Sequence, residues 1–260
     1  MKKKSLACLM ALGCTLAYAG PSVNTRAFPS FPTLPSLGCG QALFQTGAYW
    51  SHQGQAQHVN IESLIGDDFS VTRHGNVNSF FGFGYLFDGP QYRGLQLNYG
   101  VHAFYLPKTS VFGYVLQEEL FTNLSYGYYV THFPVYAALE ATTDLSRMPM
   151  PFLSKLPGKL TVDVGIGPNF MKTAGFIEHS IDGGITIPDD AFGNRSTTTF
   201  TVTAGASVIV PNVFGAMSLE CGYRFFYLGD SHLRRVNDQI LNALKTGDIY
   251  ANAVVVGVRI

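Results

Sequence analysis

The last twelve residues of the chain, 249–260, alternate between two kinds of side chain. One face carries Tyr250, Asn252, Val254, Val256, Val258 and Ile260, and the other carries Ala251, Ala253, Val255, Gly257 and Arg259. Alternation with period two is typical of a β-strand whose two faces meet different surroundings. A large apolar face opposite a small or charged one predicts a strand between lipid and a polar lumen. The segment also has the length of about 9–11 residues that a spanning strand needs.

Seven more segments alternate in the same way, which predicts eight strands in all. They are 43–53, 76–87, 92–105, 131–143, 159–171, 198–210 and 215–229. The fourth segment is the least regular, because Pro134 interrupts a longer run, 121–145, and a proline inside a strand marks a bulge or an end. We therefore place its membrane portion at 131–143 and expect 123–130 to extend into the loop.

The connections between these strands are predicted to be short and long in turn. Turn-forming residues predict tight turns at Asp88-Gly89-Pro90 and at Pro211-Asn212, and a longer inner turn covers 146–158. The long polar loops are 54–75, 106–120, 172–197 and 230–248. In the last loop the spacing of Leu233, Val236, Ile240, Leu241 and Leu244 is helical. We expect a short helix there that caps the barrel mouth.

Short connections on one side and long ones on the other are typical of outer-membrane β-barrels, with turns in the periplasm and loops outside. An open sheet in lipid would leave backbone groups unpaired, so the fold class predicted is an all-β, eight-stranded antiparallel transmembrane β-barrel. The composition agrees, since only 13% of residues are charged while Gly (28), Tyr (14) and Phe (20) are abundant. A soluble, secreted β-sandwich is the alternative. The net charge of zero disfavours a nucleic-acid partner.

The start of the chain predicts export. Residues 1–19 have the form of a cleaved signal peptide, with lysines at 2–4, an apolar run at 5–16 and Ala17-Tyr18-Ala19 as the cleavage site. Residues 20–40 form a proline-rich periplasmic lead-in, and 41–260 form the barrel. Cys39 and Cys221 remain in the mature chain, and we expect two free thiols because non-adjacent strands would hold them too far apart for a disulfide.

Parity along the strands directs a set of polar side chains into the lumen. These are His102, Glu140, Asp163, Glu220, Arg224 and Arg259, with Glu140 included if the strand keeps its register past Pro134. Side chains fill the interior of a narrow eight-stranded barrel, and unpaired charges there are costly. An ion-pair network is therefore the favoured interpretation. A gate or a small conductance path is the alternative.

On the opposite face, aromatic residues near strand ends predict girdles at the two membrane interfaces. They are Tyr85, Phe87, Tyr105, Tyr223, Phe225, Tyr227 and Tyr250. Core packing in a sandwich would explain them almost as well.

The sequence offers little support for catalysis, a metal or a cofactor. The adjacent pairs Ser51-His52 and Ser231-His232 could suggest a lipid A-modifying enzyme. Neighbours in a strand face opposite ways, however, so a hydrogen bond within each pair is disfavoured. His58, His74 and His179 are spread over separate loops without metal-ligand spacing. We predict a non-enzymatic protein without cofactor or metal.

Two late segments carry a resemblance to a known family. They are Gly222-Tyr-Arg-Phe-Phe-Tyr-Leu-Gly-Asp230 and Tyr250-Ala-Asn-Ala-Val-Val-Val-Gly-Val258. With them the whole mature chain resembles the small eight-stranded outer-membrane β-barrel proteins of gammaproteobacteria, OmpA-like in the membrane domain. The family usually ends on an aromatic residue that the barrel-assembly machinery recognises, and Ile260 departs from this.

That resemblance implies a bacterial outer-membrane location. It also implies contact with outer-membrane lipid, lipopolysaccharide and the assembly machinery, and an extracellular or host ligand on the loops. The expected role is structural or in surface interaction. A small-solute channel is the first alternative, and a lipid A-modifying enzyme is the weaker one.

Overall fold

The computed structural model describes residues 40–147 and 157–260. The predicted signal peptide, nearly all of the lead-in with Cys39, and residues 148–156 of the inner turn lie outside these ranges. The elements are β1 (Gly40–His52), β2 (Gln57–Val59), β3 (Asp67–Arg73), β4 (Val77–Tyr92), β5 (Leu95–Gln117), β6 (Phe121–Asp144), η1 (Leu145–Arg147), β7 (Lys159–Ser180), β8 (Phe192–Gly193), β9 (Arg195–Phe214), β10 (Met217–Gly229), β11 (Arg234–Arg235) and β12 (Ile249–Arg259).

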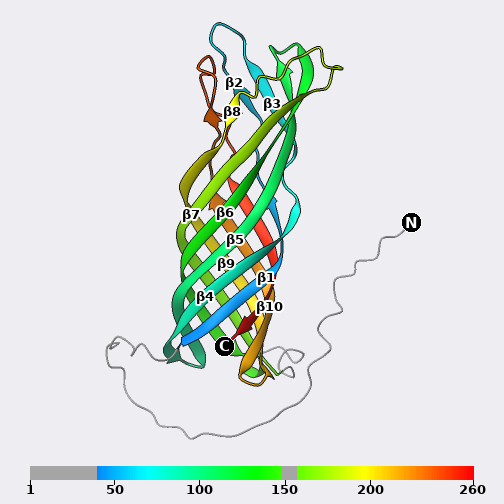
Figure 1. Ribbon diagram of the computed structural model, residues 1–260. Helices are drawn as coiled ribbons and strands as arrows, with labels where there is room; N and C mark the ends of the chain where they lie inside the picture. The colour runs from blue at the N-terminus through cyan, green and yellow to red at the C-terminus, as the bar shows by residue number, and fades with distance from the viewer. Residues whose placement is uncertain (1–39, 148–156) are drawn as a thin grey trace, which may run out of the picture. The chain divides into compact units, whose positions relative to one another are not determined.

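Eight of these strands form a closed antiparallel ring, as predicted. Its order is β1-β4-β5-β6-β7-β9-β10-β12, and β12 pairs back onto β1. The strands cross the barrel obliquely (Figure 1). The closing register sets Leu43 opposite Arg259 and His52 opposite Tyr250. Closure leaves every membrane strand with a neighbour on both sides, which a sheet in lipid requires.

The period-two pattern places side chains as the sequence analysis expected. Along β7, Val162, Val164 and Ile166 are exposed on the outer face, whereas Thr161 and Asp163 are buried. The same alternation holds in β12, where exposed Val254 and Val256 flank buried Val255. No helix in the part of the chain that the structure describes is long and apolar enough to cross a membrane.

Three of the expected outer loops are largely strand, which corrects the sequence analysis. β5 runs on to Gln117 through the predicted loop 106–120, β7 runs on to Ser180, and β9 starts at Arg195. β3 lies inside the expected loop 54–75 and pairs with the upper part of β5. Alternation continues through this region, with Val111 and Val115 buried and Phe112 exposed between them. The strands of these hairpins therefore continue well past their predicted ends (Figure 1).

Both predicted tight turns were placed too early. β4 continues past Asp88-Gly89-Pro90, and the chain turns at Arg93 and Gly94, whose φ angles are 49° and 84°. β9 likewise continues past Pro211-Asn212 to a turn at Gly215. Register shifts lie between Asp88 and Gln91 and between Met217 and Leu219. Each proline thus lies at or near a bulge, where its missing N–H does not interrupt a regular ladder of backbone hydrogen bonds.

The predicted helix in loop 230–248 was also wrong. The segment contains the short strand β11, which pairs with β8, and bridges from Ile240 to Ile61 and from His232 to Lys245. Leu233, Ile240 and Leu244 are buried, so their spacing reflects packing onto neighbouring loops. Pairing with other loops satisfies the backbone groups that a helix would have satisfied within itself.

Pro134 neither ends nor shifts β6. The β6–β7 register stays constant from Pro134 opposite Asn169 to Glu140 opposite Asp163. The inward direction of Glu140 therefore follows, as the sequence analysis required.

Candidate functional site

The most polar layer of the barrel interior is centred on Arg259, near the end that holds the short turns. Its Nη1 and Nη2 donate to the two carboxylate oxygens of Glu140, at 2.8 and 2.6 Å. Its Nε donates to Glu220 at 2.8 Å. All three side chains are buried, with at most 4% of their surface exposed. One arginine thus joins three strands, β6, β10 and β12, across the lumen.

Neutral side chains complete this layer. Gln45 and Ser207 donate to Glu220, at 3.1 and 2.6 Å. Asn98 donates to Glu140 at 3.1 Å. Two buried carboxylates and one guanidinium carry a net negative charge, and these extra donors stabilise it. These three neutral partners were not among the six lumen residues singled out from the sequence.

A second ion pair lies one layer further from the short turns. Arg224 Nη1 and Nη2 donate to Asp163 Oδ2 and Oδ1, at 2.6 and 2.9 Å, and both residues are buried. Gly205 makes room for the pair, since a Cβ there would lie 2.6 Å from Asp163 Oδ1. The Arg224 guanidinium also lies over the Phe104 ring, 5.1 Å from its centroid. Planar stacking of this kind suits an arginine in a confined interior.

His102 shares this region but not its hydrogen bonds. It is 1% exposed, and neither of its ring nitrogens has a hydrogen-bond partner among the described residues. Its ring packs edge-on against Phe104, with centroids 6.0 Å apart, and lies over Gly84. The structure therefore places five of the six predicted lumen residues in two ion-pair groups and leaves His102 beside them.

An aromatic layer fills the barrel on the extracellular side of the charges. Phe80, Phe104, Tyr136 and Phe226 are each at most 1% exposed, and their ring centroids lie 5.2–6.4 Å apart. The Tyr136 hydroxyl shares a hydrogen bond with Thr201 Oγ1 at 2.9 Å. Small residues on β12, Ala251 and Ala253, face this layer from the same interior. The layer separates the ion pairs from the extracellular end.

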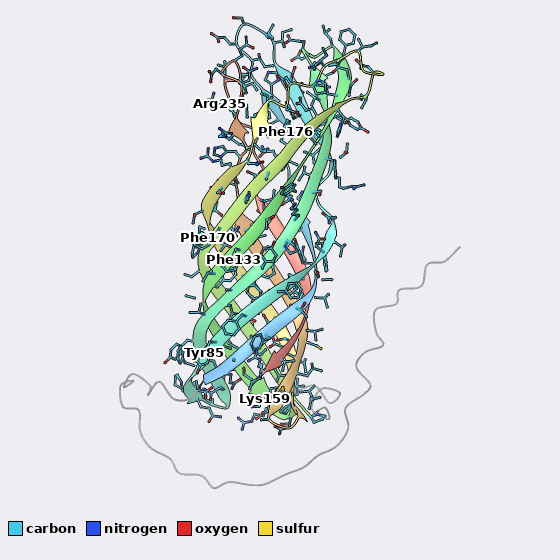
Figure 2. The ribbon with its side chains drawn as sticks, in the orientation of Figure 1. Tyr85, Phe133, Lys159, Phe170, Phe176 and Arg235 are labelled. Atoms are coloured by element: carbon cyan, nitrogen blue, oxygen red, sulfur yellow. The ribbon has the colours of Figure 1, made fainter. Side chains whose placement is uncertain are left out.

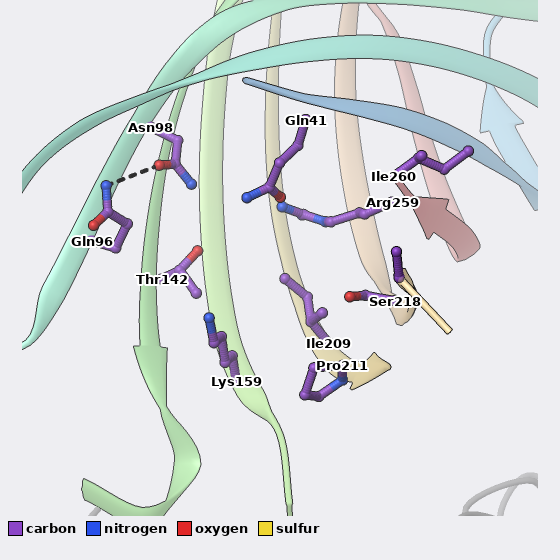
Figure 3. A pocket seen from close by; sticks show the side chains of 11 residues that line it. Gln41, Gln96, Asn98, Thr142, Lys159, Ile209, Pro211, Ser218, Arg259 and Ile260 are labelled. Atoms are coloured by element: carbon purple, nitrogen blue, oxygen red, sulfur yellow. Dashed lines mark hydrogen bonds between the residues drawn. The ribbon is translucent and has the colours of Figure 1, made fainter. Parts of the chain in front are cut away.

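Below the ion pairs the lumen opens into a small vestibule (Figure 3). The cavity has a volume of about 260 Å³ and is lined by Gln41, Gln96, Asn98, Thr142, Lys159, Ile209, Pro211, Ala216, Ser218, Arg259 and Ile260. Arg259 forms its inner end, and the Glu140 and Glu220 carboxylates that bind Arg259 lie behind it. The vestibule is thus a polar recess that ends at the network.

The extracellular end has a core of its own, built by the extended hairpins. Phe69, Tyr126, Phe176 and Phe192 pack with centroids 5.0–6.1 Å apart. Figure 2 shows Phe176 near this end and Phe133 and Phe170 lower, on the lipid-facing wall. A cavity of about 290 Å³ borders this core and is lined by four carboxylates, Asp67, Glu118, Glu178 and Asp189.

Glu178 is the most buried of these four carboxylates, with 5% of its surface exposed. Its Oε2 accepts the Asp190 N–H at 3.2 Å, and its own N–H donates to Asp190 Oδ1 at 3.0 Å. It lies at the extracellular end of β7, outside the membrane-spanning part. Burial, with the neighbouring carboxyl of Asp189, raises the pKa of Glu178 to about 8. No pattern in the sequence marks this residue.

The predicted girdle residues all lie on the outer face, mostly in two groups. Tyr85 and Phe87 pack together with centroids 5.0 Å apart, near the end with the short turns (Figure 2). Tyr250 packs with Phe225 and Tyr227, at 6.1 and 5.5 Å, towards the other end. Tyr105 is likewise exposed.

Tyr223 differs from the other girdle residues because it lies mid-strand. Its hydroxyl donates to the side chain of Asn252 on the neighbouring strand. The Tyr223 hydroxyl and the Asn252 amide thus satisfy each other's hydrogen bonding on a face that lipid covers. Nearby, Cys221 is exposed and forms no disulfide with any residue in the described ranges.

The serine–histidine pairs do not form catalytic dyads. Within the part of the chain that the structure describes, Ser51 Oγ has no hydrogen-bond partner, and His52 stacks on His74 with centroids 4.1 Å apart. Ser231 Oγ pairs with Thr197 Oγ1 at 3.1 Å. Within 40–147 and 157–260, no three His, Cys, Asp or Glu side chains are grouped as a metal site.

A closed ring of tilted strands, an apolar outer band and a filled polar interior define an eight-stranded transmembrane β-barrel of the outer-membrane type. No model of a known protein family matches the sequence, and no curated protein matches it. Several solved structures of outer-membrane proteins are similar to the chain over most of its length.

Three of these structures represent different kinds of outer-membrane protein. Neisserial surface protein A is 11% identical, with 84% of this chain and 96% of that chain covered and a TM-score of 0.37. OprG from Pseudomonas aeruginosa is 10% identical, with 85% and 96% covered and a TM-score of 0.42. The outer membrane protease OmpT from Escherichia coli is 10% identical, with 87% and 98% covered and a TM-score of 0.47.

Proposed function

We propose that the protein is a non-conducting, non-enzymatic outer-membrane barrel that holds a rigid extracellular assembly for surface interaction. The observation that carries this proposal is the filled interior: two buried ion-pair groups and an aromatic layer occupy the lumen in succession. A signal peptide, cleaved after Ala19, would direct export of the chain, and the assembly machinery would then insert the barrel.

The extended hairpins support the surface role. Strands that only had to span the membrane would end after about 9–11 residues, whereas β5, β6 and β7 have 23, 24 and 22 residues. The additional length builds the extracellular core around Phe69 and Phe192. Outside the membrane, this ordered structure provides a fixed surface to which outer-leaflet lipopolysaccharide or an extracellular ligand can bind.

The channel alternative requires a continuous wet path, and buried ion pairs oppose it. An open path through Arg259 would need its bonds to Glu140 and Glu220 to break and leave charges unpaired. A barrel of eight strands leaves little lumen beyond its own side chains, whereas open porins use about 16–18 strands.

A loop-exchange experiment tests the surface role. In one variant, the extracellular segments 53–76, 118–120, 181–194 and 230–248 are replaced by short Gly-Asn turns, and folding is checked by heat-modifiable gel mobility. We expect cells that display this variant to lose the binding to lipopolysaccharide, glycan and host-cell surfaces that the full chain confers. Equal binding by the full chain and a folded variant would contradict the proposal.

A further inference from the structure

Three arginines, Arg195, Arg234 and Arg235, line one pocket at the extracellular end of the barrel. The cavity has a volume of about 350 Å³, and its charged and polar lining is Arg195, His232, Arg234, Arg235, Asn237 and Asp238. We call it the arginine pocket. Figure 2 shows Arg235 near the extracellular end of the barrel. The volume lies within the range of about 300–1,000 Å³ that is typical of small-ligand sites.

Backbone pairing, and not chance proximity, brings these residues together. β11, which consists of Arg234 and Arg235, pairs with β8, and Val236 N–H donates to Ala191 O at 3.1 Å. The Thr173 hydroxyl lies 3.2 Å from the carbonyl oxygens of both Arg195 and His232. The start of β9 and the segment after β10 are thereby held side by side.

The lining of the pocket carries more positive than negative charge. None of the three arginines forms an ion pair with any residue that the structure describes, and Asp238 is the one acidic side chain among the lining residues. Arg235 Nη1 donates to the carbonyl oxygens of Ile240 and Leu241, at 2.7 and 2.9 Å, which fixes its guanidinium. Burial and then the charge of Arg195 hold the pKa of His232 below its usual value. An excess of positive charge favours an anion.

The position of the pocket along the barrel axis can be estimated from β9. Phe200 is the last exposed aromatic residue on β9, and Thr198 and Ser196 follow it on the outer face. Arg195 lies five positions beyond Phe200, which at about 3.3 Å per residue and a tilt of about 40° places it about 13 Å above Phe200 along the barrel axis. Phosphorylated sugars of an outer-leaflet glycolipid occupy such a level.

We propose that the arginine pocket binds phosphate esters carried on a saccharide, with Arg195 and Arg234 as the principal contacts. Guanidinium groups bind phosphate oxygens in pairs, which gives both affinity and orientation. Arg235 positions the turn that closes the pocket. This inference rests on the proposed surface role and specifies its ligand class. The saccharide phosphate belongs either to lipopolysaccharide anchored in the same leaflet or to a free phosphorylated sugar.

Binding is tested with the full chain refolded in detergent. The probes are lipopolysaccharide, the same lipopolysaccharide after chemical dephosphorylation, and soluble glucose 1,6-bisphosphate. The test variant is Arg195→Gln/Arg234→Gln. The matched control is Arg73→Gln, which removes an exposed extracellular arginine that lies over Phe112 and not in the pocket.

We expect the double variant to weaken binding of the phosphorylated probe by at least about tenfold, and Arg73→Gln to leave it within about twofold. Lipopolysaccharide binding without glucose 1,6-bisphosphate binding would identify the membrane glycolipid as the source, and binding of both would show that free sugars also enter. Equal affinity of the double variant and the wild type, or equal binding of dephosphorylated lipopolysaccharide, would overturn the inference.

The two proposals fail in distinguishable ways. If the loop-exchanged barrel loses surface binding but Arg195→Gln/Arg234→Gln keeps it, the surface role stands and the arginine pocket is wrong. If the folded loop-exchanged barrel keeps all binding, the surface role itself is wrong.

Discussion

At the scale of single residues, the barrel interior depends on charges that are fully paired. Arg224 and Asp163 are each about 2% exposed and joined by two hydrogen bonds. Water cannot solvate either group if its partner is removed. The energetic consequence is asymmetric, because breaking a buried pair costs more than replacing both partners by apolar groups.

We therefore predict different outcomes for a single and a double substitution at this pair. Arg224→Met alone should lower the free energy of unfolding in lipid vesicles by about 3–5 kcal/mol, because Asp163 remains buried without a cation. Asp163→Leu/Arg224→Met should recover most of that loss. Urea titrations monitored by Trp50 fluorescence and gel mobility measure both. A double variant no more stable than the single one would argue against a purely structural pair.

The assignment of faces can be tested one residue at a time. Val101 is 52% exposed on the outer face of β5, whereas Gln96 lines the vestibule on the inner face. Val101→Lys should destabilise the folded barrel in lipid vesicles by about 1–2 kcal/mol, because the cost of a lysine on the lipid face falls from the bilayer midplane towards the interface, and Val101 pairs with the girdle residue Tyr85. Gln96→Lys should cost far less because the vestibule is polar. Equal effects would contradict the assignment.

At the scale of elements, the extracellular hairpins are held in part by hydrogen bonds to an ionisable side chain, the carboxyl of Glu178. Glu178 at the end of β7 and Asp190 exchange two hydrogen bonds, and Asp67, Glu118 and Asp189 line the same cavity. This arrangement concentrates acidic groups around one buried carboxyl.

We predict that segment 181–191 loosens as the pH rises. In the folded protein the carboxyl of Glu178 keeps its proton up to about pH 8, whereas an unfolded segment releases it near 4.5. The local stability should fall between these two values and stay constant above pH 8, because the unfolded form binds fewer protons across that window. Hydrogen exchange of 181–191, corrected for intrinsic rates, measures the change. In Glu178→Gln the dependence should vanish, and an unchanged slope in that variant would exclude Glu178 as its cause.

Which segments form strands, and which of their side chains point into the lumen, could be predicted from the sequence because period-two alternation is a local signal. The inward direction of Glu220 and Arg259 followed from parity alone. That of Glu140 required in addition that β6 keep its register past Pro134, which the structure shows. Where strands end could not be predicted in this way. Prolines at 90, 107 and 211 resemble turn signals, yet bulges absorb them.

Long-range pairing accounts for the other differences. The spacing of Leu233, Ile240 and Leu244 is helical in isolation, but β8 and the segment near Ile61 pair with this loop. The arginine pocket is equally hidden in the sequence, since Arg195 and Arg234 come from separate loops. Which acid binds which arginine also depends on strand register, which sets Asp163 rather than Glu220 against Arg224.

At the scale of the whole barrel, the interior is a succession of filled layers. From the vestibule outwards these are the Arg259 network, the Arg224–Asp163 pair, the aromatic layer and the extracellular core. The side chains in these layers come from non-adjacent strands. Under the proposed function, the same contacts that hold the barrel together would also leave no path through it.

Single-channel recording tests this central claim most directly. Refolded protein, shown by gel mobility to be a folded barrel, is inserted into planar bilayers under an applied voltage. We predict no stable current steps from the wild-type barrel, since Arg259, Glu140 and Glu220 close the lumen. Reproducible steps of constant size, altered by Arg259→Ala, would show a continuous wet path and contradict the account.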